Sequence, residues 1–269
     1  MSNTEPTENF CRQDNYNDYM VIWNTNYSAR NALSDSYCAG IMKGLKQASN
    51  DPNIHAVILA AEGGFFCAGG NLKVLKERRA MSLDQRREKI NQLQDMIRAI
   101  RACPKPVIAA VEGGAAGAGM SVALACDMIV SAAGASFVLA YVRAGLIPDG
   151  GVTHALMKAL PRATASRMAL LAHPISAERL YELGAITEVV EAGTALEAAQ
   201  SLAQELAHGP QKAIATIKSL LDQASDTPLE EQLHAECEAM AKAMGDDEAK
   251  TGIEAFLNKQ RPNFRGQGQ

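Results

Sequence analysis

One stretch of the chain, residues 105–119 with the sequence KPVIAAVEGGAAGAG, limits the possible folds more than any other. It begins with a short apolar run of the kind that forms a buried strand. From Gly113 to Gly119 every residue is glycine or alanine, and the segment that follows has the composition of a short helix. Glycine permits tight turns and leaves the main-chain N–H groups uncovered. The sequence therefore predicts a tight strand-to-helix turn whose backbone is open to a ligand.

The first half of the chain alternates strands and helices. A helix is predicted from the Ser34 cap, and a second helix starts at Ser82, where Gln85 completes a capping box. Strands joined by helices predict a largely parallel sheet. The segments with the apolar pattern of strands are residues 19–24, 55–61, 105–111 and 127–132.

The second half is predicted to be mostly helical, with one short strand at residues 188–190. We therefore expect an α/β fold with a core over residues 1–200 and a helical C-terminal region over residues 201–269. The expected helices cover residues 152–160, 162–172, 176–183, 194–208, 210–224, 228–244 and 246–259.

Charge and composition exclude several classes of function. The net charge of -4 and the pI of about 5.8 provide no basic surface for nucleic acid or for an anionic membrane. No apolar run is long enough to span a bilayer, and the N-terminal segment lacks the pattern of a signal peptide. The six cysteines form no CxxC pair, and no cluster of residues has metal-ligand spacing. We expect a cytoplasmic protein with reduced thiols and no metal.

A glycine-rich turn between strand and helix has three common uses. It can bind phosphate, but neither GxGxxG nor a Gly-Lys-Ser/Thr sequence is present. It can hold a nucleophile, and GMSVA around Ser121 differs from GxSxG by one residue, so a serine hydrolase is an alternative. It can also present N–H groups to a developing oxyanion. A second turn of this kind, residues 63–75, follows the strand at 55–61, which favours the third use because both turns open at one edge of a parallel sheet.

Several segments resemble the crotonase, or enoyl-CoA hydratase/isomerase, superfamily. They are ARNAL (29–33), FFCAGGNLK (65–73), the glycine turn with its strand (105–119), CDMIVSA (126–132), GLIPDGG (145–151) and GIEAFLNKQRPNF (252–264). They occur in the family's order and cover nearly the whole chain. The resemblance implies a spiral ββα core, a helical trimerisation region, and a trimer or a dimer of trimers. It also implies acyl-CoA thioester substrates and no cofactor other than the coenzyme A of the substrate.

The resemblance also implies a set of site residues. The N–H groups of Gly70 and Ala118 would bind the thioester oxygen. Lys259 would approach the coenzyme A of a neighbouring subunit. The residues implied to line the coenzyme A groove are Ala29, Arg30, Ala68, Gly70, Asn71, Leu72 and Lys73.

Two positions depart from the hydratase pattern. Hydratases of this family carry a glutamate just after the glycine turn and another before the GLIP motif, and this chain has Ser121 and Tyr141 there. Hydroxyl groups of serine and tyrosine have pKa values too high for an easy base at neutral pH. Asp149 could replace the missing acids, although Pro-Asp-Gly is also ordinary turn chemistry.

The pattern around Asp149 is most similar to the ring-1,2-epoxyphenylacetyl-CoA isomerase branch and its oxepin-CoA hydrolase relatives. That similarity implies proton transfer by Asp149 and predicts an isomerase, with Ser121 and Tyr141 shaping the pocket or binding the substrate. The alternatives are a hydratase or ring-opening hydrolase without the glutamate pair, and a homologue that binds acyl-CoA or RNA without catalysis. We expect an apolar pocket to raise the pKa of Asp149. Its expected lining residues are Phe66, Leu72, Val138, Leu146 and Ile147.

Overall fold

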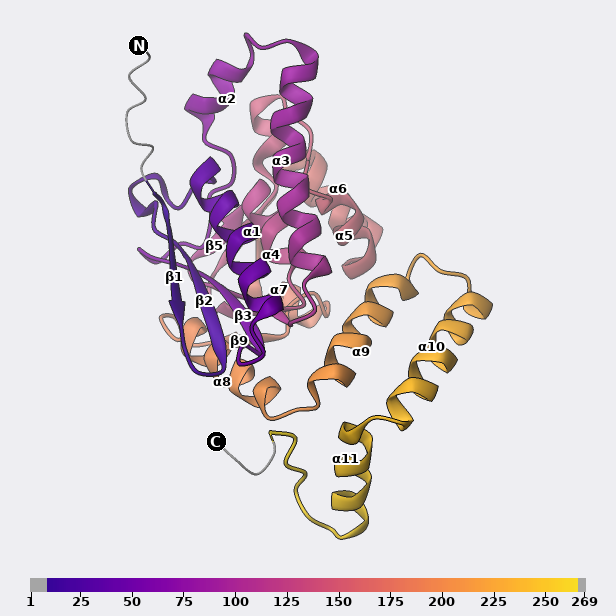
Figure 1. Ribbon diagram of the computed structural model, residues 1–269. Coiled ribbons are helices and arrows are strands. Elements are labelled where there is room, and N and C mark those ends of the chain that lie inside the picture. The colour runs from indigo at the N-terminus through magenta and orange to yellow at the C-terminus, as the bar shows by residue number, and fades with distance from the viewer. Residues whose placement is uncertain (1–8, 266–269) are drawn as a thin grey trace, which may run out of the picture.

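The computed structural model describes residues 9–265 as a mixed α/β fold (Figure 1). Its main sheet has six strands in the order β1-β2-β3-β4-β6-β9. The edge strand β1 is antiparallel to β2, and all other neighbours in this sheet are parallel, which confirms the predicted parallel core. The strand bounds are β1 Cys11–Asn15, β2 Tyr19–Asn24, β3 Ala56–Ala61, β4 Val107–Val111, β6 Met128–Ala132 and β9 Glu188–Val190.

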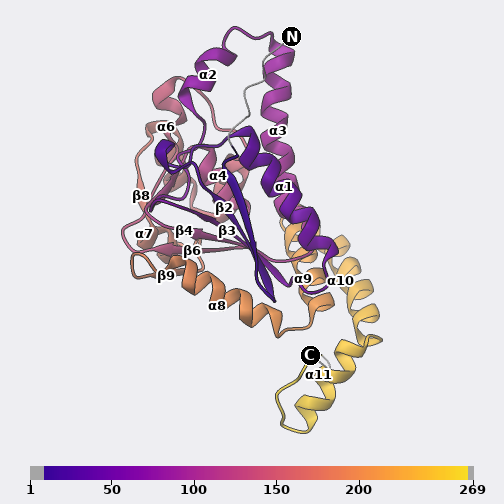
Figure 2. The ribbon, with the colours of Figure 1, turned by 60° about the vertical axis from the view of Figure 1, so that its left-hand side comes forward.

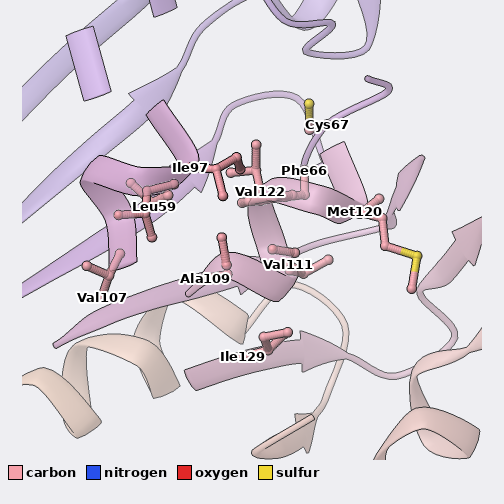
Figure 3. Close-up of a cluster of buried hydrophobic side chains, with 14 of the residues drawn as sticks. Leu59, Phe66, Cys67, Ile97, Val107, Ala109, Val111, Met120, Val122 and Ile129 are labelled. Atoms are coloured by element: carbon pink, nitrogen blue, oxygen red, sulfur yellow. The ribbon is translucent and has the colours of Figure 1, made fainter. Parts of the chain in front are cut away.

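The two faces of the main sheet are buried by different helices, because successive side chains of a strand point to opposite faces. On β3, Val57 and Leu59 belong to one core cluster, and Ile58 belongs to the other. Figure 3 shows part of the first cluster, with Leu59 beside side chains of the neighbouring strands. The helices that contribute to this first cluster include α1 (Asp35–Asn50), α3 (Leu83–Ala102) and α4 (Ala118–Ala125).

The opposite face of the sheet is covered by α8 (Ala195–Ala207). Three fully buried alanines, Ala195, Ala199 and Ala203, stand four residues apart on this helix. Residues at that spacing lie on one helix face, and their small side chains let the helix pack closely on the sheet. The predicted boundary between the core and the helical region, at residue 200, lies inside this helix, and the division itself stays a prediction.

A second sheet has three strands in the order β5-β7-β8, of which β5 follows β4, β7 follows β6, and β8 lies between α6 and α7. Its strands are β5 Gly114–Ala116, β7 Ser136–Val138 and β8 Ile175–Ser176. Gly114 has φ 138, and a β-carbon there would overlap the main-chain oxygen of Ser136, so the pairing of β5 with β7 requires glycine. The sequence does not predict these strands, because segments of two or three residues show no alternation of apolar and polar side chains.

Most of the predicted helices are confirmed to within two residues at each end. The Ser82–Gln85 capping box is present at the start of α3. The remaining helical bounds are η1 Tyr27–Ala29, α2 Leu72–Arg78, η2 Ala140–Ala144, α5 Val152–Ala159, α6 Arg162–Leu171, α7 Ala177–Glu182, α9 Gln211–Ala224, α10 Leu229–Met244 and α11 Asp247–Leu257.

The last helices extend away from the α/β core (Figures 1 and 2). Helix α10 packs against α9 and α11, and α11 lies at the opposite end of the molecule from α2 in both views. Within residues 9–265, no helix combines the length and the apolar character needed to cross a membrane.

Candidate active site

The two glycine-containing turns predicted from the sequence lie side by side. The turn after β3 and the turn after β4 are joined by a parallel bridge between Cys67 and Ala115. The Ala116 N–H donates a hydrogen bond to the main-chain oxygen of Cys67 at 2.8 Å, and the Phe66 N–H donates to the main-chain oxygen of Glu112 at 2.9 Å. The main chain of one turn thus fixes the position of the other.

Gly69 is one of the residues at which the two turns are in close contact. It has φ 84, and a β-carbon at this position would lie 2.5 Å from the oxygen of Ala116 and 2.9 Å from the nitrogen of Ala118. Both distances are too short for a real side chain. The missing side chain of Gly69 therefore lets its main chain pack against the main chain of residues 116–118, directly before Gly70 in the sequence.

The two predicted oxyanion donors, Gly70 and Ala118, are main-chain N–H groups in this region. Ala118 is the first residue of α4, so its N–H has no partner inside the helix and lies at the helix's positive end. Within residues 9–265, neither N–H donates a hydrogen bond to another group of the protein. Both donors are thus available to a ligand, and their convergence on one thioester oxygen stays a prediction.

Asp149, Tyr141 and Ser121 form a hydrogen-bonded cluster. The Tyr141 hydroxyl donates to Asp149 Oδ1 at 2.7 Å. The Ser121 hydroxyl donates to the main-chain oxygen of Asp149 at 3.0 Å and lies 3.4 Å from the Tyr141 hydroxyl. Three separate segments supply these residues, namely α4, η2 and the loop before α5. The two positions at which the sequence departs from hydratases therefore meet at the predicted acid.

Burial has a large effect on the acidity of this cluster. It raises the pKa of the Asp149 carboxyl above its ordinary value, and the hydrogen bond from Tyr141 and the positive charge of Arg78 partly offset that rise. Burial and the nearby Asp149 charge raise the pKa of the Tyr141 hydroxyl well above its ordinary value. Tyr141 therefore keeps its proton at neutral pH and acts as a donor to Asp149.

The apolar surroundings of Asp149 differ in part from the expected lining. Phe66 is buried and Val138 is half-buried. Leu72 and Ile147 are exposed, at 68% and 84%, and Leu146 is exposed as well. These last three side chains do not shield Asp149 from water within one chain. The burial instead involves the packed loop itself, where Gly150 lies against Ser121 and Ile97.

The serine hydrolase alternative is not supported by the surroundings of Ser121. Its side chain is 1% exposed, and its hydroxyl donates to a main-chain oxygen. Within residues 9–265, its oxygen makes no hydrogen bond to a histidine, which a serine nucleophile needs for activation.

Most of the predicted coenzyme A residues come together from two segments. The Ala68 N–H donates to the oxygen of Arg30 at 3.0 Å, which ties the segment after β3 to the turn that contains Ala29. The Arg30 guanidinium lies over the Phe65 ring, 4.1 Å from its centre. Asn71 caps α2 by accepting a hydrogen bond from the Lys73 N–H at 3.0 Å. The next residue, Leu72, is exposed together with Lys73 on the first turn of α2. Lys259 is not part of this group, since it follows α11 at the far end of the molecule (Figures 1 and 2).

A group of buried asparagines, Asn24, Asn26 and Asn31, supports the Arg30 turn and was not predicted. Asn31 has φ 56, and its side-chain amide donates to the oxygens of Glu62 at 2.6 Å and Phe65 at 2.7 Å. Asn24 and Asn26 donate to oxygens within the turn itself. The signal in the sequence is the density of asparagine in NTNYSARNAL, because asparagine favours turns and tolerates positive φ.

Comparison with known proteins assigns the family. The sequence model of the family described as enoyl-CoA hydratase/isomerase matches residues 17–267. The 1,2-epoxyphenylacetyl-CoA isomerase of Escherichia coli (strain K12) is 36% identical over 239 residues, which cover 88% of this chain and 90% of that protein. The 2,3-dehydroadipyl-CoA hydratase of the same strain is 30% identical over 240 residues, which cover 89% and 92%.

Solved structures agree with this assignment. An enoyl-CoA hydratase from Polaromonas sp. JS666 has a TM-score of 0.92 to this chain at 40% identity, over 95% of this chain and 99% of that structure. The predicted crotonase fold with its helical C-terminal region is thereby confirmed. The chain is a crotonase-type enzyme and belongs to the enoyl-CoA hydratase/isomerase family.

Proposed function

We propose that this enzyme isomerises an acyl-CoA thioester, shifting a double bond or rearranging a ring, with Asp149 as the proton carrier. The observation that carries the proposal is the contact between Asp149 and the two hydroxyl residues that stand at the glutamate positions of hydratases. The site thus has one carboxyl group where hydration normally uses two. The similarity to a protein named as a 1,2-epoxyphenylacetyl-CoA isomerase supports the same choice.

The substrate is proposed to bind through coenzyme A and through its thioester oxygen. Arg30 and the segment from Ala68 to Lys73 would line the coenzyme A groove, and the N–H groups of Gly70 and Ala118 would bind the oxygen. Both N–H groups are open to a ligand, and Ala118 adds the positive end of α4. Each such donor contributes about 3 kcal/mol to stabilising the enolate-like transition state.

In the proposed reaction the ionised Asp149 carboxylate removes a proton from the carbon next to the thioester carbonyl. The electron pair of that C–H bond moves toward the thioester oxygen, where the two N–H groups stabilise it. Asp149 then returns the proton to another carbon as the double bond forms at its new place, so the product has the mass of the substrate. Because this exchange balances without electron transfer, we propose that the coenzyme A of the substrate is the only coenzyme involved.

Water addition is the less favoured reaction at this site. Hydration would require a second group able to take a proton from water, and the raised pKa of Tyr141 keeps its hydroxyl protonated, so it has no free phenolate to act as that base. Ser121 is also unsuited, because it is buried and its proton is directed to a main-chain oxygen.

A panel of acyl-CoA substrates followed by mass spectrometry tests the proposal. A 3-enoyl-CoA should be converted to a product of equal mass, and Asp149→Asn should lower kcat by a factor on the order of 10³. Asn has nearly the shape of Asp, and circular dichroism would check that the variant is folded. Rapid conversion of crotonyl-CoA with the gain of one water, at a rate unchanged in Asp149→Asn, would contradict the proposal.

We also propose that the chain works in the cytoplasm as a trimer or a dimer of trimers. The support for assembly is a set of large apolar side chains that one chain leaves exposed on its last helices. These are Ile217, Leu221, Leu229, Leu233, Met240, Met244, Ile253, Phe256 and Leu257. Exposed apolar surface on this scale is typical of an interface. The six free thiols fit a reducing compartment.

A further inference from the structure

Asp149 is held at two points by two hydroxyl groups. Tyr141 donates to Oδ1 of its carboxylate at 2.7 Å, and Ser121 donates to its main-chain oxygen at 3.0 Å. Within residues 9–265, no side chain donates a hydrogen bond to Oδ2. The two carboxylate oxygens therefore have different surroundings, because only Oδ1 has a side-chain donor.

The hydroxyl protons in this cluster have clear acceptors. A hydroxyl has one proton to donate. The Tyr141 oxygen lies 2.7 Å from Asp149 Oδ1 and 3.4 Å from the Ser121 oxygen, so its proton goes to the carboxylate. Ser121 uses its own proton on the main chain of Asp149. Tyr141 is thus the one side chain of the cluster that acts directly on the carboxylate.

We propose that Tyr141 is a positioning residue that holds Asp149 Oδ1, supports the ionised carboxylate, and leaves Oδ2 to exchange a proton with the substrate. The inference rests on the proposed function in taking Asp149 as the acid and base. It adds a reason for tyrosine at a position where hydratases of this family have a catalytic glutamate. Tyr141 itself transfers no proton, because its hydroxyl remains protonated throughout.

The groups that face Asp149 determine the sign of the expected effect. Tyr141 comes from η2, Ser121 from α4 and the positively charged Arg78 from α2, while Ile97 of α3 lies against the next residue, Gly150. Burial raises the pKa of Asp149, and the Tyr141 hydrogen bond, the main-chain N–H of Asp149 itself and the Arg78 charge lower it. Loss of the Tyr141 hydroxyl leaves the burial and the other two interactions in place, so the pKa of Asp149 must rise.

Tyr141→Phe tests the inference, because it removes one oxygen and keeps the ring. The pKa of Asp149 can be measured by nuclear magnetic resonance on protein with ¹³C-labelled aspartate carboxyl groups, with Asp149→Asn used to assign the signal. We expect the pKa to rise by about one unit, as the loss of a hydrogen bond to a charged group predicts. The acid limb of the kcat profile should move to higher pH by the same amount, because the base must be ionised.

Two further proteins make the test specific. Tyr181→Phe removes a tyrosine hydroxyl from the exposed face of α7 and should leave both the pKa of Asp149 and kcat unchanged. Site-specific incorporation of 3-fluorotyrosine at position 141 makes the donor more acidic and strengthens its hydrogen bond. The pKa of Asp149 should then fall, which is the opposite direction from Tyr141→Phe.

An unchanged pKa of Asp149 in Tyr141→Phe would overturn the inference, whatever the enzyme's activity. A shifted pKa in an enzyme that converts no acyl-CoA of the panel to a product of equal mass would retain the positioning role and refute the proposed isomerisation. Isomerisation together with an unchanged pKa of Asp149 would support the proposed function and refute the positioning role of Tyr141. The two proposals therefore fail on different measurements.

Discussion

Gly69 lies where the two turns of the site touch, and the site depends on its missing side chain. Its positive φ is unfavourable for other residues, and a β-carbon there would also press on the Ala118 nitrogen at 2.9 Å. Gly70 follows Gly69 in the chain, so this contact also affects where the Gly70 N–H lies. At the scale of a residue, the proposed oxyanion hole therefore requires glycine at position 69, because every other amino acid has a β-carbon there.

Gly69→Ala should separate the two turns and misalign the Gly70 and Ala118 donors. We expect kcat to fall by a factor on the order of 10² to 10³, the effect of losing one oxyanion donor. Steady-state kinetics on the best substrate of the panel measures this loss. Gly64→Ala is the matched control, because Gly64 lies in the same turn with φ 72 and a β-carbon there meets no atom within 4 Å. Equal losses in the two variants would mean that backbone strain, and not the contact, is responsible.

The sequence predicts the residues of this site better than it predicts their contacts. Asp149, Ser121 and Tyr141 are found from motif positions, and both glycine turns are found from composition. The hydrogen bond from Tyr141 to Asp149 is not found in this way. It requires the chain to turn back after η2, where Gly145 has φ 66, and no periodic pattern of side chains encodes that turn.

At the scale of an element, α9 is attached to the α/β core by a buried ion pair. The Lys218 Nζ donates to Asp127 Oδ2 at 2.7 Å and to the main-chain oxygens of Ile100 and Lys105, each at 3.3 Å. Asp127 also accepts the Val107 N–H at 2.7 Å. One lysine thus links the first of the projecting helices to the end of α3 and to the start of β4.

Lys218→Met should destabilise the fold by about 3–5 kcal/mol, because it leaves the Asp127 charge buried without a partner. Chemical denaturation measures this free energy of unfolding. Lys212→Met is the control, since the Lys212 ion pair with Asp246 is solvent-exposed and its loss should change stability far less. If both variants lost a similar free energy of unfolding, the buried Lys218 pair would contribute no more to stability than the exposed Lys212 pair.

The stability that Lys218→Met loses should depend on pH in a defined direction. Burial raises the pKa of Asp127 in the folded chain above its ordinary value. Removal of the Lys218 cation raises it further, so the folded state binds this proton more tightly than the unfolded state does. Protonation then relieves the buried charge, and the stability lost in Lys218→Met should be smaller at about pH 5 than at about pH 7. A loss that grows toward acid pH would contradict this account.

The sequence predicts the helices of this fold better than it predicts the short strands of the second sheet. Helices with clear caps, such as α1 after Ser34 and α3 after Ser82, begin where expected because the cap is a local hydrogen bond. The strands β5, β7 and β8 form only by pairing with segments that are distant in the sequence. In β5 the residues Gly114–Ala116 have almost no side chains, so the pairing with β7 is visible only in three dimensions.

At the scale of the whole molecule, the projecting helices α9 to α11 leave apolar side chains in water that a second copy could cover. Leu221 on α9 is 70% exposed and Met244 at the end of α10 is 66% exposed. Light scattering should give three or six times the chain mass of 28.7 kDa. Leu221→Asp should lower that mass, because it places a charge in the proposed interface. Leu83→Asp, at an exposed position on α3, is the control that should leave the mass unchanged.

We predict that Lys259 connects assembly to the active site. In one chain it follows α11, far from α2, so the predicted contact with coenzyme A would have to be made in a neighbouring subunit (Figures 1 and 2). Lys259→Glu should raise KM for acyl-CoA by repelling the phosphates of coenzyme A, and Asp149→Asn should lower kcat by a factor on the order of 10³. When the two variants are coexpressed, some sites combine an intact Asp149 from one chain with an intact Lys259 from the other. Such mixed assemblies should regain a low KM, because each lysine serves a neighbour's site. Activity equal to the simple average of the two separate variants would place Lys259 outside the coenzyme A site.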